Sequence, residues 1–206
     1  MSESPPINNE TRALARILAF HRIDVVLDVG AQDGRYGLRL RQGGYRGWIV
    51  SFELVPDLHR ALRTAALGDD RWRVASPLAL GDHEGTLTPR PSVETADDDD
   101  DLVPLARLDH VFDRHVAAED RVFLRLGSQG SDHAVLAGAA GVLPRIRGIA
   151  IELALVPVYP GEPDYMAAIG HLAGLGFTPV LFSPGYFNRQ TARQLTMDAV
   201  FVRLNE

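Results

Sequence analysis

The sequence predicts a doubly wound α/β domain whose sheet is mostly parallel and ends in an antiparallel pair of strands. Short runs of β-branched residues alternate with amphipathic segments of helical spacing along most of the chain. This alternation is typical of a parallel sheet with right-handed crossovers. Near the C-terminus, two strand-like runs follow one another without a helix between them, so we expect them to be antiparallel neighbours.

Each strand is predicted from a short apolar run and each helix from apolar residues three or four positions apart. Leu14, Ile17 and Leu18 give the first helix its apolar face, and Pro56 is favoured in the first turn of a later one. The predicted strands are 25–29, 48–52, 73–75, 122–126, 149–153, 178–182 and 199–203. The predicted helices are 11–20, 35–42, one starting near 56, 134–143 and 165–175. A sheet of seven such strands that finishes in an antiparallel pair is typical of the class I methyltransferase, or Rossmann-like, type.

The length and net charge of the chain narrow the range of domain organisations and binding partners that the sequence allows. The chain has 206 residues, 46% of them hydrophobic, which suits a single domain over residues 1–206 with a loose segment at 1–9. Its net charge of −6 and the absence of a dense basic run disfavour nucleic acid or an anionic membrane surface as the main partner. Five consecutive aspartates at 97–101 are interpreted as a solvated loop without chemistry. The acidic net charge fits a small-molecule substrate better than a nucleic acid or a membrane surface.

The chain has no cysteine, which excludes disulfides, thiolate metal sites and thiol nucleophiles. Its first twenty residues do not have the pattern of a signal peptide, and no apolar run is long enough to span a bilayer. We therefore expect a cytoplasmic protein. The sequence leaves open whether it is a monomer or a homo-oligomer.

A glycine-containing turn follows the first predicted strand. Asp28, Gly30, Gln32 and Gly34 lie in it, and glycine allows a cofactor to approach the backbone closely. The G-x-x-x-G spacing differs from the G-x-G-x-x-G that binds a pyrophosphate, so a dinucleotide is disfavoured. S-adenosyl-L-methionine has no phosphate, and its amino acid end is expected to bind Asp28 and the amides of this loop.

Acidic residues at two further strand ends support this cofactor. Glu53 ends the second strand about twenty residues after the glycines, where an acidic side chain can accept both ribose hydroxyls, with Leu54 beside it. Asp82 follows the segment 79–81 and is a candidate for the adenine amine, although the interpretation as a plain turn residue is nearly as well supported.

In the order and spacing of these motifs the sequence resembles the FkbM-type methyltransferases. The matching segments cover most of the chain from about residue 23: 28–34, 51–53, 79–82 with Gly85, 108–109, 124–130, 135–139, 151–153 and 198–203. The resemblance implies an S-adenosylmethionine-dependent O-methyltransferase acting on a small hydroxylated metabolite, in secondary metabolism or in sugar tailoring.

One position departs from the family pattern. After the fourth strand the family usually has lysine, an aliphatic residue and aspartate, whereas this chain has Arg125, Leu126 and Gly127. Three interpretations stay open. Asp132 or His133 supplies the missing base, or positioning alone suffices for methyl transfer. Alternatively, methyl transfer is lost, and the pocket serves a binding protein or a catalyst of cyclisation or rearrangement.

Other strand-end groups complete the candidate list. Glu152 ends the fifth strand and is either a contact for a substrate hydroxyl or amine or a solvated strand end. Tyr159 lies in a proline-rich loop that we expect to cover the substrate pocket. The histidines do not show the spacing of a helical zinc site, so no metal is predicted.

Overall fold

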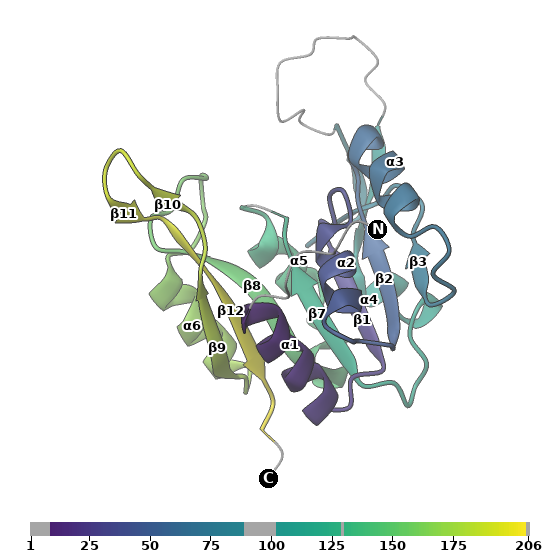
Figure 1. Cartoon of the computed structure of the whole chain (residues 1–206). Helices are drawn as coiled ribbons and strands as arrows, with labels where there is room; N and C mark the ends of the chain where they lie inside the picture. The colour runs from purple at the N-terminus through teal and green to yellow at the C-terminus, as the bar shows by residue number, and fades with distance from the viewer. Residues whose placement is uncertain (1–8, 89–101, 129, 205–206) are drawn as a thin grey trace.

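The protein is described here from a computed structural model, which covers residues 9–88, 102–128 and 130–204. A seven-stranded sheet forms its centre, in the order β3-β2-β1-β7-β8-β12-β9 (Figure 1). β12 is antiparallel to both its neighbours, and the other pairs are parallel. The strands are β1 (Val25–Val29), β2 (Trp48–Phe52), β3 (Trp72–Val74), β7 (Val122–Leu126), β8 (Ile146–Ala154), β9 (Thr178–Pro184) and β12 (Thr196–Val202). The predicted sheet is thereby confirmed, including its antiparallel end.

Helices cover both faces of the sheet. α1 (Asn9–Phe20), α2 (Arg35–Gln42) and α3 (Pro56–Ala65) pack on one face, and α4 (Leu108–Val111), α5 (Asp132–Gly138) and α6 (Tyr165–Gly174) on the other. β1 is buried at every position, with Val26 facing the first group of helices and Leu27 the second. This two-sided burial explains why four of the five residues of β1, all but Asp28, are apolar and do not alternate with polar ones. Within the described residues, no helix is long and apolar enough to cross a membrane.

Several short elements are absent from the sequence prediction. A second sheet joins β4 (Ala79–Gly81), β6 (Val103–Arg107) and β5 (Gly85–Leu87), and β10 (Phe187–Asn188) pairs with β11 (Arg193–Gln194) in a small hairpin. Most of these strands have two or three residues, which is too few for a two-residue period to be recognised. The aspartate run 97–101 lies outside the described residues.

Two predicted boundaries need correction. The helix predicted at 134–143 is α5, which begins at Asp132 and ends at Gly138, and a short 3₁₀ helix, η2 (Leu143–Arg145), follows it. Gly138 packs so closely on β4 that a Cβ atom there would collide with the carbonyl oxygen of Gly81. The fifth predicted strand is longer than expected, because β8 pairs with β7 over residues 146–150 and with β12 over residues 148–154.

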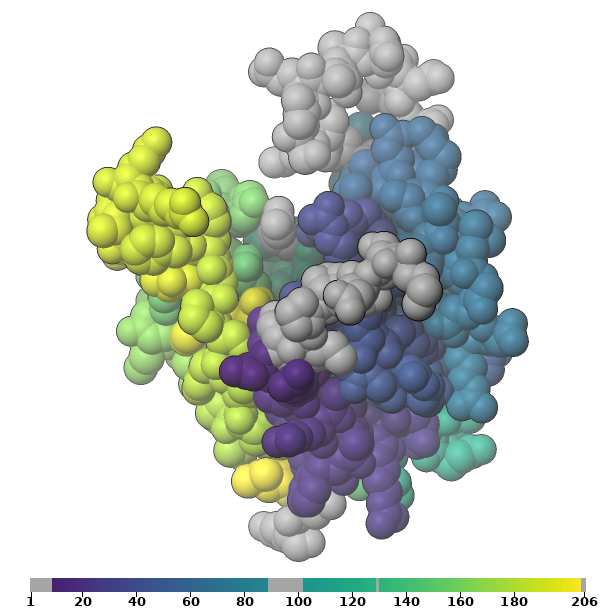
Figure 2. Space-filling model, viewed as in Figure 1, coloured from purple at the N-terminus to yellow at the C-terminus, as the bar shows by residue number. Residues whose placement is uncertain are grey.

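The sheet topology brings the candidate residues to one edge. The carboxyl ends of β1, β2, β7 and β8 meet there, and β12, which runs the other way, begins there. The order of strands reverses between β1 and β7, and ligands of open α/β sheets bind at such a point. Figure 2 shows the surface hollowed between the β10–β11 hairpin and the body of the molecule.

Candidate active site

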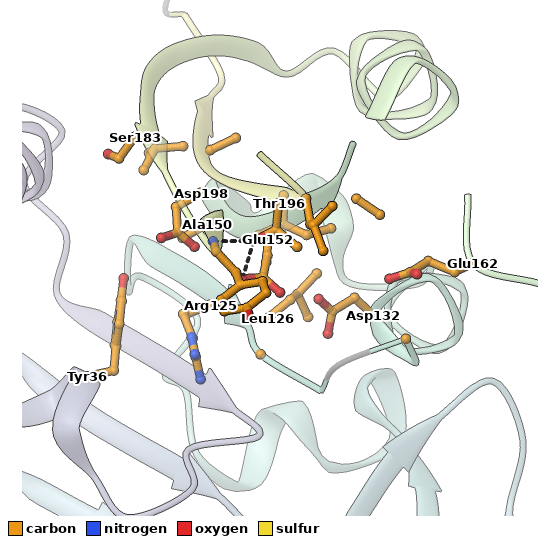
Figure 3. A pocket seen from close by; sticks show the side chains of 18 of the residues that line it. Tyr36, Arg125, Leu126, Asp132, Ala150, Glu152, Glu162, Ser183, Thr196 and Asp198 are labelled. Carbon is orange, nitrogen blue, oxygen red and sulfur yellow. Dashed lines mark hydrogen bonds between the residues drawn. The ribbon is translucent and has the colours of Figure 1, made fainter. Parts of the chain in front are cut away.

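A cavity of about 340 Å³ opens at this edge of the sheet (Figure 3). Its walls come from α1, α2, the ends of β7 and β8, the start of β12, and the loops that follow β8 and β9. Its polar and charged lining residues are Glu10, Gln32, Tyr36, Arg39, Arg125, Asp132, Glu152, Tyr159, Glu162, Ser183, Tyr186, Thr196 and Asp198. A second cavity of about 450 Å³ lies on the α5–α6 side and shares Asp132 and Glu152 with the first.

The two glycines of the β1–α2 loop are required by chain packing. Gly30 has a φ of +69°, and a Cβ atom there would lie 2.6 Å from the carbonyl oxygen of Gly127. Gly34 has a φ of +85°, and its Cβ atom would lie 2.9 Å from Cβ of Ala65 in α3. The sequence argument, that glycine makes room for a cofactor, thus misses the nearer reason. Glycine brings this loop against the end of β7 and α2 against α3.

Glu53 joins the glycine loop to the end of β2. Only 5% of the residue is exposed. One carboxylate oxygen accepts hydrogen bonds from the amides of Leu54 (2.9 Å) and Val55 (2.8 Å), and the other accepts one from the amide of Gln32 (2.7 Å). The structure therefore brings Gln32, Glu53 and Leu54 together as the sequence predicts. A carboxylate has about four lone-pair sites, so acceptor capacity remains for a ligand hydroxyl.

Asp28 lies beneath the cavity rather than in its wall. It is fully buried, and its carboxylate accepts hydrogen bonds from Arg125 Nη1 (3.2 Å) and from the hydroxyl of Ser51 (3.3 Å). Burial raises the pKa of Asp28, and the neighbouring Arg125 guanidinium opposes that rise. The carboxylate that the sequence assigns to the cofactor's amino acid end is therefore engaged by Arg125 in this structure.

Arg125 takes the space that a side chain at position 127 would occupy. A Cβ atom on Gly127 would collide with the guanidinium carbon and both terminal nitrogens of Arg125. The guanidinium is held there by the carbonyl oxygen of Gly30 (2.8 Å from Nη1) and by the ring of Tyr36, whose centroid lies 4.9 Å from Cζ. The glycine at 127 and the arginine at 125 are thus sterically coupled. Sequence reasoning noted Gly127 but did not assign Arg125 a role.

Of the two candidate bases, only Asp132 reaches the first cavity. Asp132 begins α5, is 9% exposed, and accepts a hydrogen bond from the amide of Ser128 (2.7 Å). Burial, its largest influence, raises the pKa of Asp132 to about 6. His133 is exposed, and it lines the second cavity but not the first. The neighbouring positions point to different sides because successive residues of a helix are about 100° apart.

Glu152 and Asp198 face each other at the far side of the cavity. They are paired residues of the antiparallel strands β8 and β12. Thr196 donates its hydroxyl hydrogen bond to Glu152 (3.0 Å). Partial burial raises the pKa of each carboxyl group, and the charge of Asp198 adds to the rise at Glu152. Sequence reasoning named Glu152 but missed Asp198, whose place depends on the β8–β12 register.

Asp82 and Tyr159 are the remaining candidate residues that the sequence predicts. Asp82 is exposed, lines neither cavity, and forms a 2.6 Å contact with Nδ1 of His83, which lowers the pKa of Asp82. Tyr159 lines the first cavity, as expected for its loop, and its ring packs against Gly130. No group of three or more metal-ligating side chains among the described residues has the arrangement of a metal site.

Comparison with known proteins identifies the fold and the family. The model of the FkbM methyltransferase domain matches residues 28–179. A search of curated proteins found no significant match. Magnesium protoporphyrin IX methyltransferase from Synechocystis with bound S-adenosylhomocysteine is similar in structure, with a TM-score of 0.55 at 10% identity, over 95% of this chain and 82% of that one. An rRNA methylase from Streptococcus thermophilus has a TM-score of 0.53 at 14% identity, and both chains are covered completely.

These likenesses establish the class I methyltransferase fold that the sequence predicts. The family match covers well over half of the chain, and S-adenosyl-L-methionine is the methyl donor of such proteins. The chain belongs to the FkbM methyltransferase family.

Proposed function

We propose that this protein is an S-adenosylmethionine-dependent O-methyltransferase of a small hydroxylated metabolite, in secondary metabolism or sugar tailoring. The observation that carries the proposal is the position of Asp132. This buried carboxylate lies in the wall of a cavity that also contains Gln32 of the glycine loop and Gly127 at the end of β7. The proposed base and the proposed cofactor loop thus border the same space.

The residues at the sheet edge fit the cofactor. Glu53 is proposed to accept hydrogen bonds from the two ribose hydroxyls, one at its free acceptor site and the other in place of one of the amides of Gln32, Leu54 and Val55 that donate to it in this structure. The loop from Gly30 to Gly34 would hold the amino acid end, with Asp28 acting through Arg125. Asp82 is proposed for the adenine amine. When bound, S-adenosylmethionine supplies a methyl group on a sulfonium centre.

Asp132 is proposed as the general base. With a pKa of about 6 it is mostly deprotonated at neutral pH, and it is still basic enough to accept a proton from a hydroxyl group as the oxygen becomes nucleophilic. The amide of Ser128 fixes one carboxylate oxygen. Glu152, on the neighbouring strand, would orient the substrate. His133 is a weaker candidate, because it lines only the second cavity.

A second function is favoured by the contact between Arg125 and Gly127. A guanidinium stands where the family usually has a carboxylate. This arrangement also suits a methyltransferase-like protein that binds the cofactor or a metabolite without transferring the methyl group, or one that catalyses a cyclisation or rearrangement in the same pocket.

We propose further that the substrate is a small molecule and that the protein acts in the cytoplasm as a single domain without a metal ion. The net charge of −6 supports a substrate other than RNA, although an rRNA methylase shares the fold. The oligomeric state is left to measurement, by light scattering at several protein concentrations.

The proposal is tested by two measurements made in sequence. Calorimetric titration with S-adenosylmethionine and S-adenosylhomocysteine measures cofactor binding, and mass spectrometry then looks for the gain of one methyl group on hydroxylated metabolites. Binding with transfer supports the O-methyltransferase. Tight binding without transfer to any candidate favours the second function, and no binding of either compound refutes both.

A further inference from the structure

Asp198 receives no hydrogen bond on its side chain within the part of the chain that the structure describes. It lies on β12, is half-buried, and lines the first cavity. Its side-chain oxygens accept no hydrogen bond from any residue that the structure describes, although Arg39 and Arg125 act on it electrostatically. A carboxylate withdrawn from water without a donor is unfavourable unless a partner completes it. We therefore expect a hydrogen-bond donor of a bound ligand in the cavity to complete the carboxylate of Asp198.

Two other acceptors lie around the same space. Glu152 is directly opposite Asp198 in the β8–β12 register, and Thr196 supplies one of its oxygens with a hydrogen bond. The hydroxyl oxygen of Tyr36 is buried and has no hydrogen-bond partner among the described residues. In Figure 3 the hydroxyl end of Tyr36 points toward Asp198. These three groups come from β8, β12 and α2, so only the folded chain brings them together.

The charges of the cavity favour a cation. Five carboxylates line it, namely those of Glu10, Asp132, Glu152, Glu162 and Asp198, against the two guanidinium groups of Arg39 and Arg125. Arg125 is already paired with the buried carboxylate of Asp28. A metal cation is disfavoured, because the described residues contain no group of three or more ligands that could hold one. An organic ammonium group has three N–H donors, which matches three acceptors.

We propose that Asp198, Glu152 and the hydroxyl of Tyr36 bind a primary ammonium group of the acceptor, so that the substrate class is a small amino alcohol. The cavity of about 340 Å³ suits a small molecule of this kind. An ammonium nitrogen has no lone pair, so a group held in this way is a recognition element and the hydroxyl remains the methyl acceptor. This inference rests on the proposed O-methyltransferase function.

The test uses a matched pair of probes, trans-2-aminocyclohexanol and cyclohexanol, titrated into the full-length protein and followed by amide chemical shifts in NMR. We expect the amine to bind at least about tenfold more tightly than the alcohol. The Asp198→Asn variant should lose this preference, and Tyr36→Phe should reduce it. Glu119→Gln, which removes one charge from an exposed site, should retain it. Equal binding of both probes, or an unchanged preference in Asp198→Asn, would overturn the proposal.

A second titration separates this inference from the proposed function. The same probes are added with and without saturating S-adenosylhomocysteine. Simultaneous binding of the amine and S-adenosylhomocysteine supports an acceptor site. Mutual exclusion would overturn the inference, because the carboxylates would then hold the cofactor's own ammonium group. Amine preference in a protein that does not bind S-adenosylhomocysteine would leave the ammonium site standing and refute the methyltransferase instead.

Discussion

At the end of β7, the guanidinium group of Arg125 occupies the space that a side chain at Gly127 would need. The sequence itself shows that Gly127 departs from the family pattern, which has an aspartate at this position. It does not predict that Arg125 turns back over this glycine. That conformation depends on Asp28 and on the carbonyl oxygen of Gly30, which belong to another strand and its loop. Partners so distant in the sequence are fixed only by the sheet.

Restoring the family's aspartate at position 127 is expected to destabilise the protein. In Gly127→Asp the new Cβ atom must displace Arg125, which leaves Asp28 buried without its cation. The free energy of unfolding should fall by about 3 kcal/mol, measured by urea denaturation. Gly170→Asp is the control, because Gly170 is exposed and a Cβ atom there meets nothing within 4 Å. Equal stability of both variants would contradict the steric coupling.

Asp132→Asn tests the base through the pH dependence of methyl transfer. Asp132 must be deprotonated to accept a proton, so the rate of the wild-type protein should rise with pH through about 6 and then level off. The variant should lose about two to four orders of magnitude in kcat and this rise with it. An unchanged pH profile in Asp132→Asn would assign the proton transfer to another group.

The same variant is expected to be more stable than the wild type at neutral pH. Burial raises the pKa of Asp132 in the folded state above its unfolded value. Folding is therefore opposed as the pH rises from about 4 through about 6, because the unfolded chain releases this proton first. Asparagine removes that effect and should add about 2 kcal/mol at pH 7 but little at pH 3, measured by urea denaturation. A gain of equal size at both pH values would contradict the raised pKa.

Among the elements, the buried central strands of the main sheet follow from the sequence, and the strands of the two small sheets do not. β1, β2 and β7 have the predicted bounds, since each is a buried run of five residues. The strands of the small second sheet are held by their pairing with one another rather than by a local pattern. The predicted end of α5 at residue 143 was wrong: the helix ends at Gly138, which packs against Gly81 of β4, far away in the sequence.

The start of α2 depends on a glycine at position 34. Gly34→Ala combines a left-handed φ of +85° with a collision against Ala65, whereas Gly44→Ala has a φ of +95° in open space. Both variants should lose stability from backbone strain, by about 1 kcal/mol. Gly34→Ala should lose about 1–3 kcal/mol more, from overpacking. The comparison is made by urea denaturation, and equal losses would show that packing on α3 is unimportant.

At the scale of the whole molecule, the strand order assembles the site. β12 begins where the parallel strands end, and this places Asp198 opposite Glu152. The sequence predicts that the last two strands form an antiparallel pair, but not the register between β12 and β8. Register is set by burial over the full length of both strands, which local patterns do not contain. The juxtaposition of Gln32 and Glu53 at neighbouring parallel strands was therefore easier to predict than that of Glu152 and Asp198.

Glu53 joins the glycine loop to the end of β2, so its contribution to cofactor binding is the most direct test of the proposed site. Calorimetric titration of the wild type, Glu53→Gln and Glu119→Gln with S-adenosylhomocysteine compares a buried carboxylate at the sheet edge with an exposed one elsewhere. Circular dichroism first establishes that each variant is folded. We predict one molecule bound per chain, with affinity about ten- to a hundredfold weaker in Glu53→Gln alone. Absence of binding in the wild type, or equal affinity in all three folded proteins, would contradict the account.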